Sequence, residues 1–204
     1  MVEKQEAQWT PKTELGKKVA SGEITSLDQA LQTGKKILEP EIIDALVPDL
    51  KEEVIDVKST QRMTAYGRKM QMRAVVIVGN GTGIIGIGIG KGAETRDAIA
   101  EAIRDAKKNL VKLKFGCGSW ECACGENHSI PIEITGKASS TRVTLKAAPK
   151  GIGIVAGRTA KKVLVLAGLK DVWSFTSGRT RNALNTALAV IDAFNSLNKQ
   201  KKGN

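Results

Sequence analysis

The residues best suited to chemistry are three cysteines and one histidine within a single segment of twelve residues. They are Cys117, Cys122, Cys124 and His128, and the 204-residue chain has no other cysteine or histidine. Thiolates and imidazole are the usual ligands of a tetrahedral structural zinc. The spacing differs from the paired C-x2-C knuckles of most zinc sites. Two interpretations therefore stay open: a structural zinc, or a reduced, partly buried cysteine loop with a hydrogen-bonded histidine.

A catalytic zinc would need more than these four residues. It would keep an open coordination position beside a general base, for which Glu121 or Glu126 would be the candidates. A structural zinc would instead hold together a short linker that has no core of its own. No other part of the sequence calls for a cofactor.

The charge of the chain is large and unevenly placed. The net charge is +11, but residues 1–56 carry a net −5 and residues 57–204 a net +16. Such a field attracts phosphate polymers and strengthens their binding through counterion release. Aromatic residues make up only 3% of the chain, which disfavours base stacking on aromatic platforms. We therefore expect contacts to phosphates and 2′-hydroxyls of double-stranded RNA, or to the backbone of duplex DNA.

Several classes of protein are disfavoured by the sequence. No apolar run is long enough for a transmembrane helix, so we expect no membrane partner. The first thirty residues lack the apolar segment of a secretory signal. An odd number of cysteines in a chain without such a signal favours reduced thiols or metal ligands, and thus a cytoplasmic protein.

Four segments follow from pattern and composition. Residues 1–52 form an acidic extension, with helices expected near 27–38, capped by Ser26, and over 40–46. This extension would be either a docking arm for a neighbouring protein or a partly ordered acidic tail. Residues 117–129 are the Cys/His linker. The patterned segments lie on either side of that linker, at 53–116 and 130–204.

Residues 53–116 alternate strands and one helix. We expect a strand over 53–60, a basic loop over 61–69, a strand over 70–78, a turn at Asn80-Gly81 and a strand over 84–90. In this last strand isoleucines alternate with glycines, so one face is buried and the other admits a close neighbour. We expect that neighbour to be the following helix, at 93–111, and not RNA backbone. The residues expected to be buried on this helix are Ile99, Ile103, Ala106 and Leu110.

Residues 130–204 have a second pattern. Strands at 130–135 and 142–147 flank a turn at 136–140, and a glycine-rich basic loop follows at 150–158. A helix over 159–167 ends at Gly168, a strand covers 170–175, and a basic tail begins at 199. The helix expected over 181–197 would present one face made of Leu184, Leu188, Ile191 and Asn195, with Ala187 and Phe194 beside it.

Two segments resemble nucleotide-binding motifs in part of their residue pattern but lack other features that the motifs require. Gly81 to Gly86 fits G-x-G-x-x-G, but it lies in a hairpin that leads into a strand, where the dinucleotide motif requires a helix. Gly90-Lys91 resembles the end of a P-loop, but Ile85 and Gly92 replace the residues that the loop requires. We reject both motifs.

Two long segments carry a family resemblance. The sequence VVIVGNGTGIIGIGIGKGAETRDAI at 75–99 resembles the signature of universal small-subunit ribosomal protein five. The sequence AAPKGIGIVAGRTAKKVLVLAGLKDVW at 147–173 resembles the second-domain signature of that family. The likeness spans about residues 53–197 in order, and the acidic extension and the GSWEC…HSIP insert resemble the archaeal form.

The resemblance implies an α+β protein with two domains. The first would be like a double-stranded-RNA-binding domain, and the second would be a β-α-β-α layer that is also found in some small-molecule kinases. The implied function is that of a structural constituent of the small ribosomal subunit in the cytoplasm, without enzymatic activity. The implied partners are small-subunit rRNA, small-subunit ribosomal protein four with its neighbours, and mRNA where it enters the subunit, with a role in decoding accuracy.

Some residues can be matched to the family individually. The basic segment 62–69 matches the family loop that reaches rRNA, and Lys91 with Gly92 matches the end of the first signature. The chain departs from the common bacterial pattern at residues 65–69, AYGRK, where a Lys-Gly-Gly-Arg run is frequent. It also has Ile152 where the second signature commonly has threonine, which removes one hydroxyl donor.

The cationic side chains that we expect to bind RNA come from the loops and helices of both basic halves. They are Arg62, Arg68, Lys69, Arg73, Lys91, Arg104, Lys107, Lys108, Lys112, Lys150, Arg158, Lys161, Lys162, Arg179 and Arg181.

Two alternative functions remain from the sequence. One is a double-stranded-RNA-binding protein that works outside the ribosome and carries a structural zinc. The other is an enzyme of the small-molecule kinase type, which would need a carboxylate for magnesium beside its phosphate-binding loop. Residues 150–158 contain no acidic side chain, which disfavours the kinase.

Overall fold

The computed structural model describes residues 9–34 and 36–199, and it divides into two compact units. The first is Met1–Leu50 and the second is Lys51–Asn204. The second unit contains both basic segments together with the Cys/His linker. The boundaries expected at 52, 116 and 129 stay predictions.

The first unit is helical, as its composition indicates, but its helices are short. They are α1 Glu14–Ala20, α2 Leu27–Gln32 and α3 Glu41–Leu46. The Ser26 hydroxyl accepts a hydrogen bond from the Gln29 amide and caps α2, as expected. The expected extension of this helix to 38 is wrong, because the chain leaves helical geometry at Gly34, where φ is +66°. Helix α1 was not expected from the sequence.

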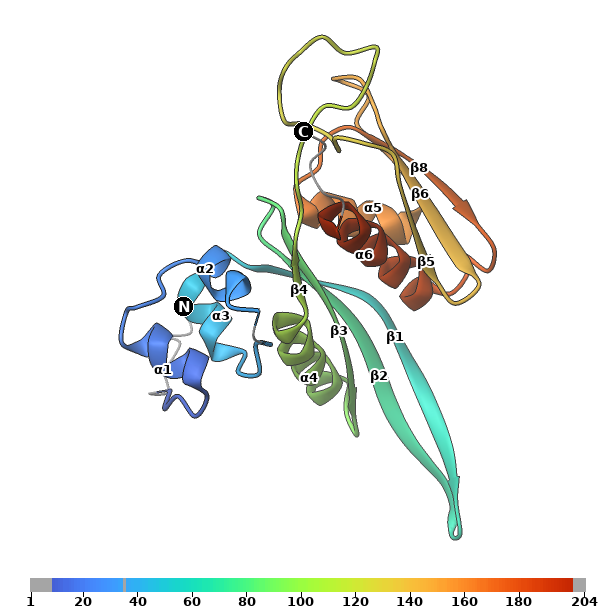
Figure 1. Ribbon diagram of the computed structural model, residues 1–204. Coiled ribbons are helices and arrows are strands. Elements are labelled where there is room, and N and C mark those ends of the chain that lie inside the picture. The colour runs from blue at the N-terminus through green and yellow to red at the C-terminus, as the bar shows by residue number, and fades with distance from the viewer. Residues whose placement is uncertain (1–8, 35, 200–204) are drawn as a thin grey trace, which may run out of the picture. The chain divides into compact units, whose positions relative to one another are not determined.

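The first sheet of the second unit is antiparallel, with strands β1 Lys51–Thr64, β2 Gly67–Gly79, β3 Ile84–Gly92 and β4 Leu110–Lys112 in that order. The expected basic loop over 61–69 is wrong. β1 and β2 stay paired up to Thr64 and Gly67, so only Ala65 and Tyr66 form the turn of a long hairpin (Figure 1). Helix α4 Thr95–Lys108 ends earlier than expected, because residues 110–112 leave it to form the edge strand.

Helix α4 lies on the glycine face of β3, as predicted. A Cβ atom on Gly88 would lie 2.0 Å from the Ala102 carbonyl oxygen, and one on Gly90 would lie 2.1 Å from that of Ala98. The expected buried stripe is therefore only partly right. Its buried residues are Ala98, Ala102 and Ala106, while Ile99 and Ile103 are half-buried. The helix approaches so closely that only alanine fits at the contact.

The second sheet has the strand order β5-β6-β8-β7. Its strands are β5 Ile134–Ala138, β6 Thr141–Ala147, β7 Ile154–Val155 and β8 Val172–Ser177, and β7 runs parallel to β8. The expected turn over 136–140 is wrong, because pairing continues to Ala138 and Thr141 and leaves only Ser139 and Ser140 unpaired. Helix α5 Arg158–Ala167 ends at Gly168 in the left-handed conformation, as expected. The basic tail was expected from Lys199, but this residue still belongs to helix α6 Ala183–Lys199, and the rest of the expected tail, 200–204, lies outside the described residues.

Helix α6 Ala183–Lys199 buries Ala187 and Phe194, which were expected beside its main face, but does not bury that face itself. Leu188 is exposed, and Leu184, Ile191 and Asn195 are only half-buried. The buried residues are Thr186, Ala187, Ala189, Val190, Ala193, Phe194 and Leu197. A Cβ atom on Gly136 of β5 would lie 2.0 Å from the Ala189 carbonyl oxygen. The small residues of α6 therefore face the sheet, as on α4, and the larger aliphatic residues lie at the sides.

One hydrophobic core joins the two sheets of the second unit. Val75, Ile77, Ile85 and Ile87 of the first sheet belong to the same cluster as Leu164 of α5, Phe194 of α6 and Val143 and Leu145 of the second sheet. Figure 1 shows α5 and α6 between the two sheets, with α4 on the outer face of the first. Within the described part of the chain, no helix has the length and apolar character needed to span a membrane.

Candidate nucleic-acid interface and Cys/His cluster

A row of cationic side chains crosses the first sheet beyond the edge of the core. Lys58 of β1 is paired with Arg73 of β2, which is paired with Lys91 of β3. Directly paired residues of an antiparallel sheet project from the same face. Because strand residues alternate, this face also carries Val75 and Ile77 into the core. The face of the sheet that packs on the core therefore becomes a cationic surface where the core ends.

Lys58 and Arg73 of this row form one side of a cleft of about 530 Å³. The residues that line the cleft come from β1, β2, the β5–β6 turn and the segment around the start of α6. They are Lys58, Arg73, Ser139, Ser140, Arg179, Arg181, Asn182 and Asn185. Half of these residues are cationic and none is acidic, although Asp56 lies 2.7 Å from the Lys58 Nζ atom. The cleft thus presents positive charge together with hydroxyl and amide groups.

Arg73, which lines this cleft, has one hydrogen-bond donor without an acceptor among the described residues. Its Nε atom is buried and has no hydrogen-bond partner among the described residues. Buried polar groups nearly always have partners, so an exception needs an explanation. An anionic ligand is the simplest acceptor for a guanidinium group.

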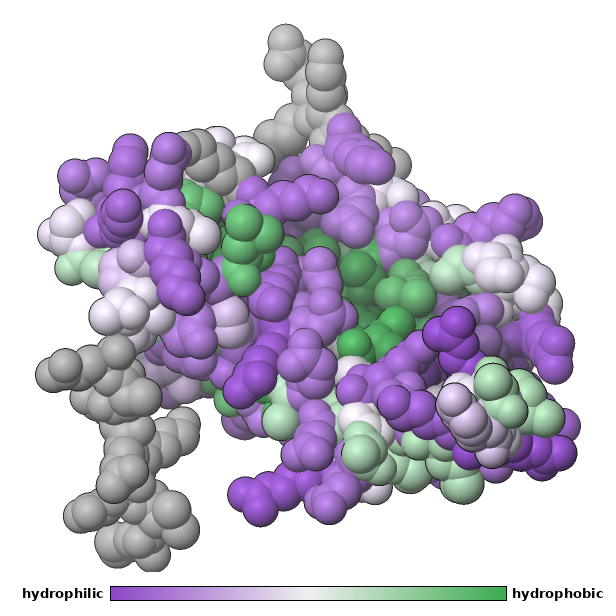
Figure 2. Space-filling view, turned by 90° about the horizontal axis from the view of Figure 1, so that it is seen from below, coloured by the Kyte–Doolittle hydropathy of each residue, from purple (hydrophilic) through white to green (hydrophobic). Residues whose placement is uncertain are grey.

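The tip of the β1–β2 hairpin is a second cationic surface. Arg62 is paired with Lys69 and Met63 with Arg68, and all four side chains are exposed. Tyr66 at the turn is fully exposed. Figure 1 shows the hairpin extending well past α4, and hydrophilic residues cover most of the face in Figure 2. The tip can therefore reach a partner at a distance from the core.

Other expected RNA-binding residues take part in ion pairs within the chain. Arg104 lies 3.7 Å from Glu101, and Lys107, whose side chain is only 14% exposed, lies 3.9 Å from Glu52. Lys108 and Lys112 are exposed at the end of α4 and on β4. The positive field of this helix face is thus partly neutralised.

Residues 150–162 are divided between surface and interior. Lys150, Arg158 and Lys161 are exposed. Lys162 is half-buried: its Nζ lies 2.6 Å from a Glu53 carboxylate oxygen and donates a hydrogen bond to the Val54 carbonyl. Lys162 thereby joins α5 to β1. Its place among the RNA-binding residues stays a prediction, as does that of the other residues in the expected set.

The structure adds residues that sequence reasoning missed. Lys58, Asn182 and Asn185 line the cleft, but they are distant in sequence and form no local pattern. Tyr66 could have been noticed, because it is the only tyrosine of the chain and lies within a basic segment. The identification of the three cleft residues depends on the strand register and on the close packing of the two sheets.

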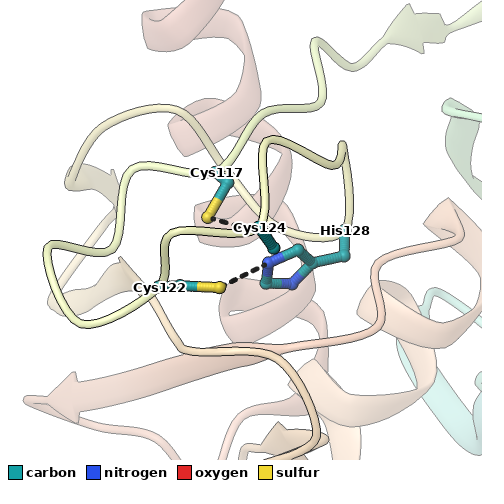
Figure 3. A group of neighbouring side chains, drawn as sticks. All are labelled: Cys117, Cys122, Cys124 and His128. Atoms are coloured by element: carbon teal, nitrogen blue, oxygen red, sulfur yellow. Dashed lines mark hydrogen bonds between the residues drawn. The ribbon is translucent and has the colours of Figure 1, made fainter.

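The three cysteines and the histidine come together in the loop before β5, as Figure 3 shows. Their ligand atoms all lie within 4.8 Å of one another. The Cys122 Sγ–His128 Nε2 and Cys124 Sγ–Cys117 Sγ distances are both 3.6 Å. Sulfur ligands of a tetrahedral zinc lie about 3.8 Å apart, given Zn–S bonds of about 2.3 Å. The four residues therefore fit a structural zinc in number, chemical type and spacing.

The surroundings of the cluster favour a bound cation. A hydrogen bond from the Cys124 thiol and others from the backbone amides of Lys150 and Cys124 lower the pKa of Cys122 to about 6. The same thiol pair raises the pKa of Cys124. The lowered pKa of Cys122 favours the thiolate, which is the form that binds metal.

The expected general base of a catalytic zinc is engaged elsewhere. Glu126 is paired with Lys150 at 2.8 Å, and the hydrogen bond from Lys150 lowers the pKa of this carboxyl group. Glu121 is exposed on the surface of the loop. This arrangement favours a structural metal over a catalytic one.

Taken together, the two sheets, their shared core and the cationic cleft define a basic α+β protein in the part that the structure describes. Comparison with known proteins makes this specific. The family description "Ribosomal protein S5, N-terminal domain" matches residues 50–114, and "Ribosomal protein S5, C-terminal domain" matches residues 136–202. The chain belongs to the ribosomal protein S5 family.

Individual relatives agree with this over nearly their whole length. The small ribosomal subunit protein uS5 of Methanoregula boonei is 55% identical over 199 residues, which cover 98% of this chain and 97% of the relative. The proteins of the same name from Methanospirillum hungatei and Methanocaldococcus jannaschii are each 53% identical, and cover 97% and 94% of this chain and 96% and 88% of their own lengths. The expected family, its archaeal form and its two-domain α+β class are confirmed. Because this family is structural and not enzymatic, the kinase alternative is set aside.

Proposed function

We propose that this chain is a structural constituent of the small ribosomal subunit and binds small-subunit rRNA through the cationic cleft and the hairpin tip. The names of its relatives support the ribosomal part of the proposal. The observation that carries the RNA-binding part is the cleft, which Arg73 lines together with three other cations, Lys58, Arg179 and Arg181. The buried Nε of Arg73 has no hydrogen-bond partner among the described residues.

The chemistry of the cleft suits an RNA backbone. Arginines bind phosphate oxygens through two parallel hydrogen bonds, and Lys58 adds a point charge. Asn182, Asn185 and the two serines supply donors and acceptors of the kind that contact sugar 2′-hydroxyls and phosphates. Contacts of this type position a protein on folded RNA without reading its sequence.

The hairpin tip would add a second contact. Its cations would neutralise phosphates, and the exposed ring of Tyr66 would stack on an unpaired base. Such stacking tolerates any base, because every base has a π face. Stacking on Tyr66 would be an exception to the expectation that the low aromatic content disfavours base stacking.

We also propose the finer ribosomal role that the family resemblance implies. In the cytoplasmic ribosome the chain would lie beside small-subunit ribosomal protein four, contribute to the surface where mRNA enters, and influence decoding accuracy. The acidic N-terminal unit would then dock on a neighbouring protein, because its negative charge is unsuited to RNA contact.

We propose a structural zinc for Cys117, Cys122, Cys124 and His128. The loop between β4 and β5 contains no helix and only one isolated bridge, at Gly116 and Ser129, so a metal would supply the cross-links that this segment lacks. The other residues of the fold form their core without it.

The RNA-binding proposal is tested by neutralising one side of the cleft. Arg179→Ala with Arg181→Ala should weaken the binding of the full chain to small-subunit rRNA and lower the salt slope by about one per lost phosphate contact. The control is Lys114→Ala with Lys137→Ala, which removes the same charge from exposed positions outside the cleft. Equal losses in both pairs would show that the cleft has no special role.

The ribosomal assignment is tested by sedimentation of the tagged chain in cell extract. Co-sedimentation with small subunits in near-stoichiometric amounts is expected. A chain found only in light fractions would favour the RNA-binding protein outside the ribosome.

Zinc is tested by mass spectrometry of the purified protein. We expect zinc in proportion to the protein, and its loss in Cys122→Ser with rRNA binding retained. Undiminished metal in this variant would contradict the proposed ligand set.

A further inference from the structure

Asp171 is a buried carboxylate between the Cys/His cluster and the glycine-rich loop at residues 150–153. Only 5% of the residue is exposed. Its Oδ1 atom accepts hydrogen bonds from the backbone amides of Gly151 at 3.1 Å and Gly153 at 2.8 Å. Its Oδ2 atom lies 2.8 Å from Nδ1 of His128. One side chain therefore contacts both loops, and a buried charge of this kind is stable only when it is so partnered.

The backbone holds Asp171 and His128 in fixed register. The His128 carbonyl accepts hydrogen bonds from the amides of Lys170 at 3.1 Å and Asp171 at 3.3 Å, and the Ser129 hydroxyl donates to the Asp171 carbonyl. The imidazole ring consequently has one nitrogen toward Cys122 and the other toward the carboxylate. Nδ1 has no well-directed hydrogen bond among the described residues, so this carboxylate is the partner within its reach.

The orientation of the ring is the one that a metal ligand requires. A histidine that binds metal through Nε2 usually donates its Nδ1 proton to a carboxylate or carbonyl, which fixes the tautomer and the ring plane. The Nδ1–Oδ2 contact provides such an acceptor. Coordination at Nε2 makes the Nδ1 proton more acidic and strengthens its hydrogen bond to the carboxylate.

The glycine-rich loop depends on the other oxygen of the same carboxylate. Gly151 and Gly153 have φ angles of +95° and +79°, which residues with a Cβ rarely adopt. Both amides converge on Oδ1, and the Gly153 carbonyl accepts a hydrogen bond from the Val172 amide. The loop presents Lys150 and Ile152 at the surface. Asp171 therefore holds the two glycine amides of the loop, while Lys150 pairs with Glu126 at the surface.

We propose that Asp171 is a positioning residue that couples metal binding in the Cys/His cluster to the conformation of the glycine-rich loop. This rests on the proposed zinc. When metal holds His128, the carboxylate is held as well, and it orders the amides of Gly151 and Gly153. When metal is absent, the histidine turns more freely, the carboxylate follows, and the amides of Gly151 and Gly153 are held less firmly.

The test is hydrogen exchange of the Gly151 and Gly153 amides in the full chain, with zinc and after its removal by a chelator. We expect exchange to become at least about tenfold faster without zinc, whereas the amide of Val190 in the α6 core keeps its protection. Unchanged exchange in a protein that binds zinc would overturn the coupling and leave the zinc site standing. A chain that binds no zinc would overturn both proposals.

Asp171→Asn distinguishes the contact of this side chain with the glycine amides from its contact with His128. Asparagine keeps one oxygen for the glycine amides but lacks the charge that faces His128. We expect about 10- to 100-fold weaker zinc binding in chelator competition, together with glycine-amide exchange that no longer responds to zinc. The matched control is Glu126→Gln, which breaks the surface pair of the same two loops with Lys150. An equal loss of zinc affinity in both variants would assign the effect to general loop charge and overturn the role of Asp171.

Discussion

Arg73 has a buried hydrogen-bond donor that disfavours folding and would favour the binding of an anion. Its Nε is buried without a partner among the described residues, and an unsatisfied buried donor destabilises a protein by roughly 1–3 kcal/mol. The neighbouring lining residues are cationic or neutral, so none of them supplies an anionic acceptor. A phosphate would satisfy the guanidinium and screen the repulsion within the cleft at the same time.

Replacement of Arg73 by methionine should therefore separate binding from stability. Arg73→Met keeps most of the aliphatic length and removes the charge and the unpaired donor. We expect weaker rRNA binding, with the salt slope lowered by about one, and an unfolding free energy that stays equal or rises. Filter binding at several salt concentrations and denaturant titration measure the two quantities. A clear loss of stability would show that Arg73 serves the fold.

Glu39 gives the first unit a dependence on pH. Its carboxylate accepts hydrogen bonds from the Trp9 indole at 3.0 Å and from the amides of Lys12 at 3.0 Å and Thr13 at 2.7 Å. Burial raises the pKa of Glu39, but these hydrogen bonds together outweigh it and hold the pKa below the ordinary 4.5. A lowered pKa means stabilisation that is complete above the unfolded value and is lost as pH falls through the folded one.

We accordingly expect the Thr13 amide to keep its protection from hydrogen exchange at neutral pH and to lose it as the pH falls below about 4.5. Glu39→Gln should weaken this protection at neutral pH and remove its pH dependence. Nuclear magnetic resonance of the amide across the titration is the measurement. Protection that responds to pH in the same way in both proteins would show that another group is responsible.

Among the elements, β3 and α4 depend on the absence of side chains at their contact. The amide and carbonyl groups of α4 lie where a Cβ atom on Gly88 would be, so the helix and the strand cannot both keep their places around a larger residue. The same arrangement recurs where Gly136 of β5 meets Ala189 and Ala193 of α6. In both sheets, glycine on the strand and alanine on the helix thus let the two backbones approach closely.

Gly88→Ala should destabilise the second unit by about 3 kcal/mol, at the upper end of the range for overpacked cores. Gly157→Ala is the matched control, because no atom lies within 4 Å of the position of its Cβ and its φ of −62° suits alanine. We expect this control to change stability by about 0.5 kcal/mol or less. Thermal unfolding of both variants measures the two losses of stability. Similar midpoints would mean that α4 can shift away from the substituted residue with little loss of stability.

At the scale of the whole second unit, the two sheets share one core and so should unfold together. The ion pair of Lys162 with Glu53 and the close contact of Gly79 with the Leu166 carbonyl further join helix α5 to the first sheet. This has a functional consequence, because the cleft takes residues from both sheets. Its cationic groups keep their spacing only while the shared core is intact.

Phe194→Ala tests this cooperativity. Phe194 is fully buried in the shared core, and truncation of such a residue costs about 3–5 kcal/mol. We expect the loss to be equal when it is followed by amide exchange in β2 and in β8. A loss confined to β8 would show that the two sheets unfold independently, and that the cleft is held by weaker forces.

The features predicted correctly from sequence were local ones. The alternation of glycine and isoleucine in 84–90 predicted a helix-covered face, because strand residues alternate with a fixed period of two. Ser26, Asn80-Gly81 and Gly168 marked a helix cap, a turn and a helix end through conformations that only a few residue types favour. The cluster of Cys117 to His128 was visible because its members are close in the chain and chemically distinctive.

The errors came where local pattern gave way to packing. The polar sequence of 61–69 indicated a loop, yet it continues a hairpin, because two-residue turns and cross-strand pairing do not require apolar side chains. The aliphatic residues of α6 indicated a face through Leu188, yet Gly136 lets alanines approach the sheet and displaces the larger residues to the sides.

The sequence by itself determined the family, the uneven charge, the α+β class and the candidate metal ligands, because each of these depends on composition or on neighbouring residues. Only the tertiary structure decided that Arg73 and Arg179, which are far apart in the chain, line one cleft. It also decided that Asp171 lies between His128 and the glycine-rich loop. Such contacts depend on strand register and on the packing of helices between two sheets, and these are set by the core as a whole and by no local stretch of residues.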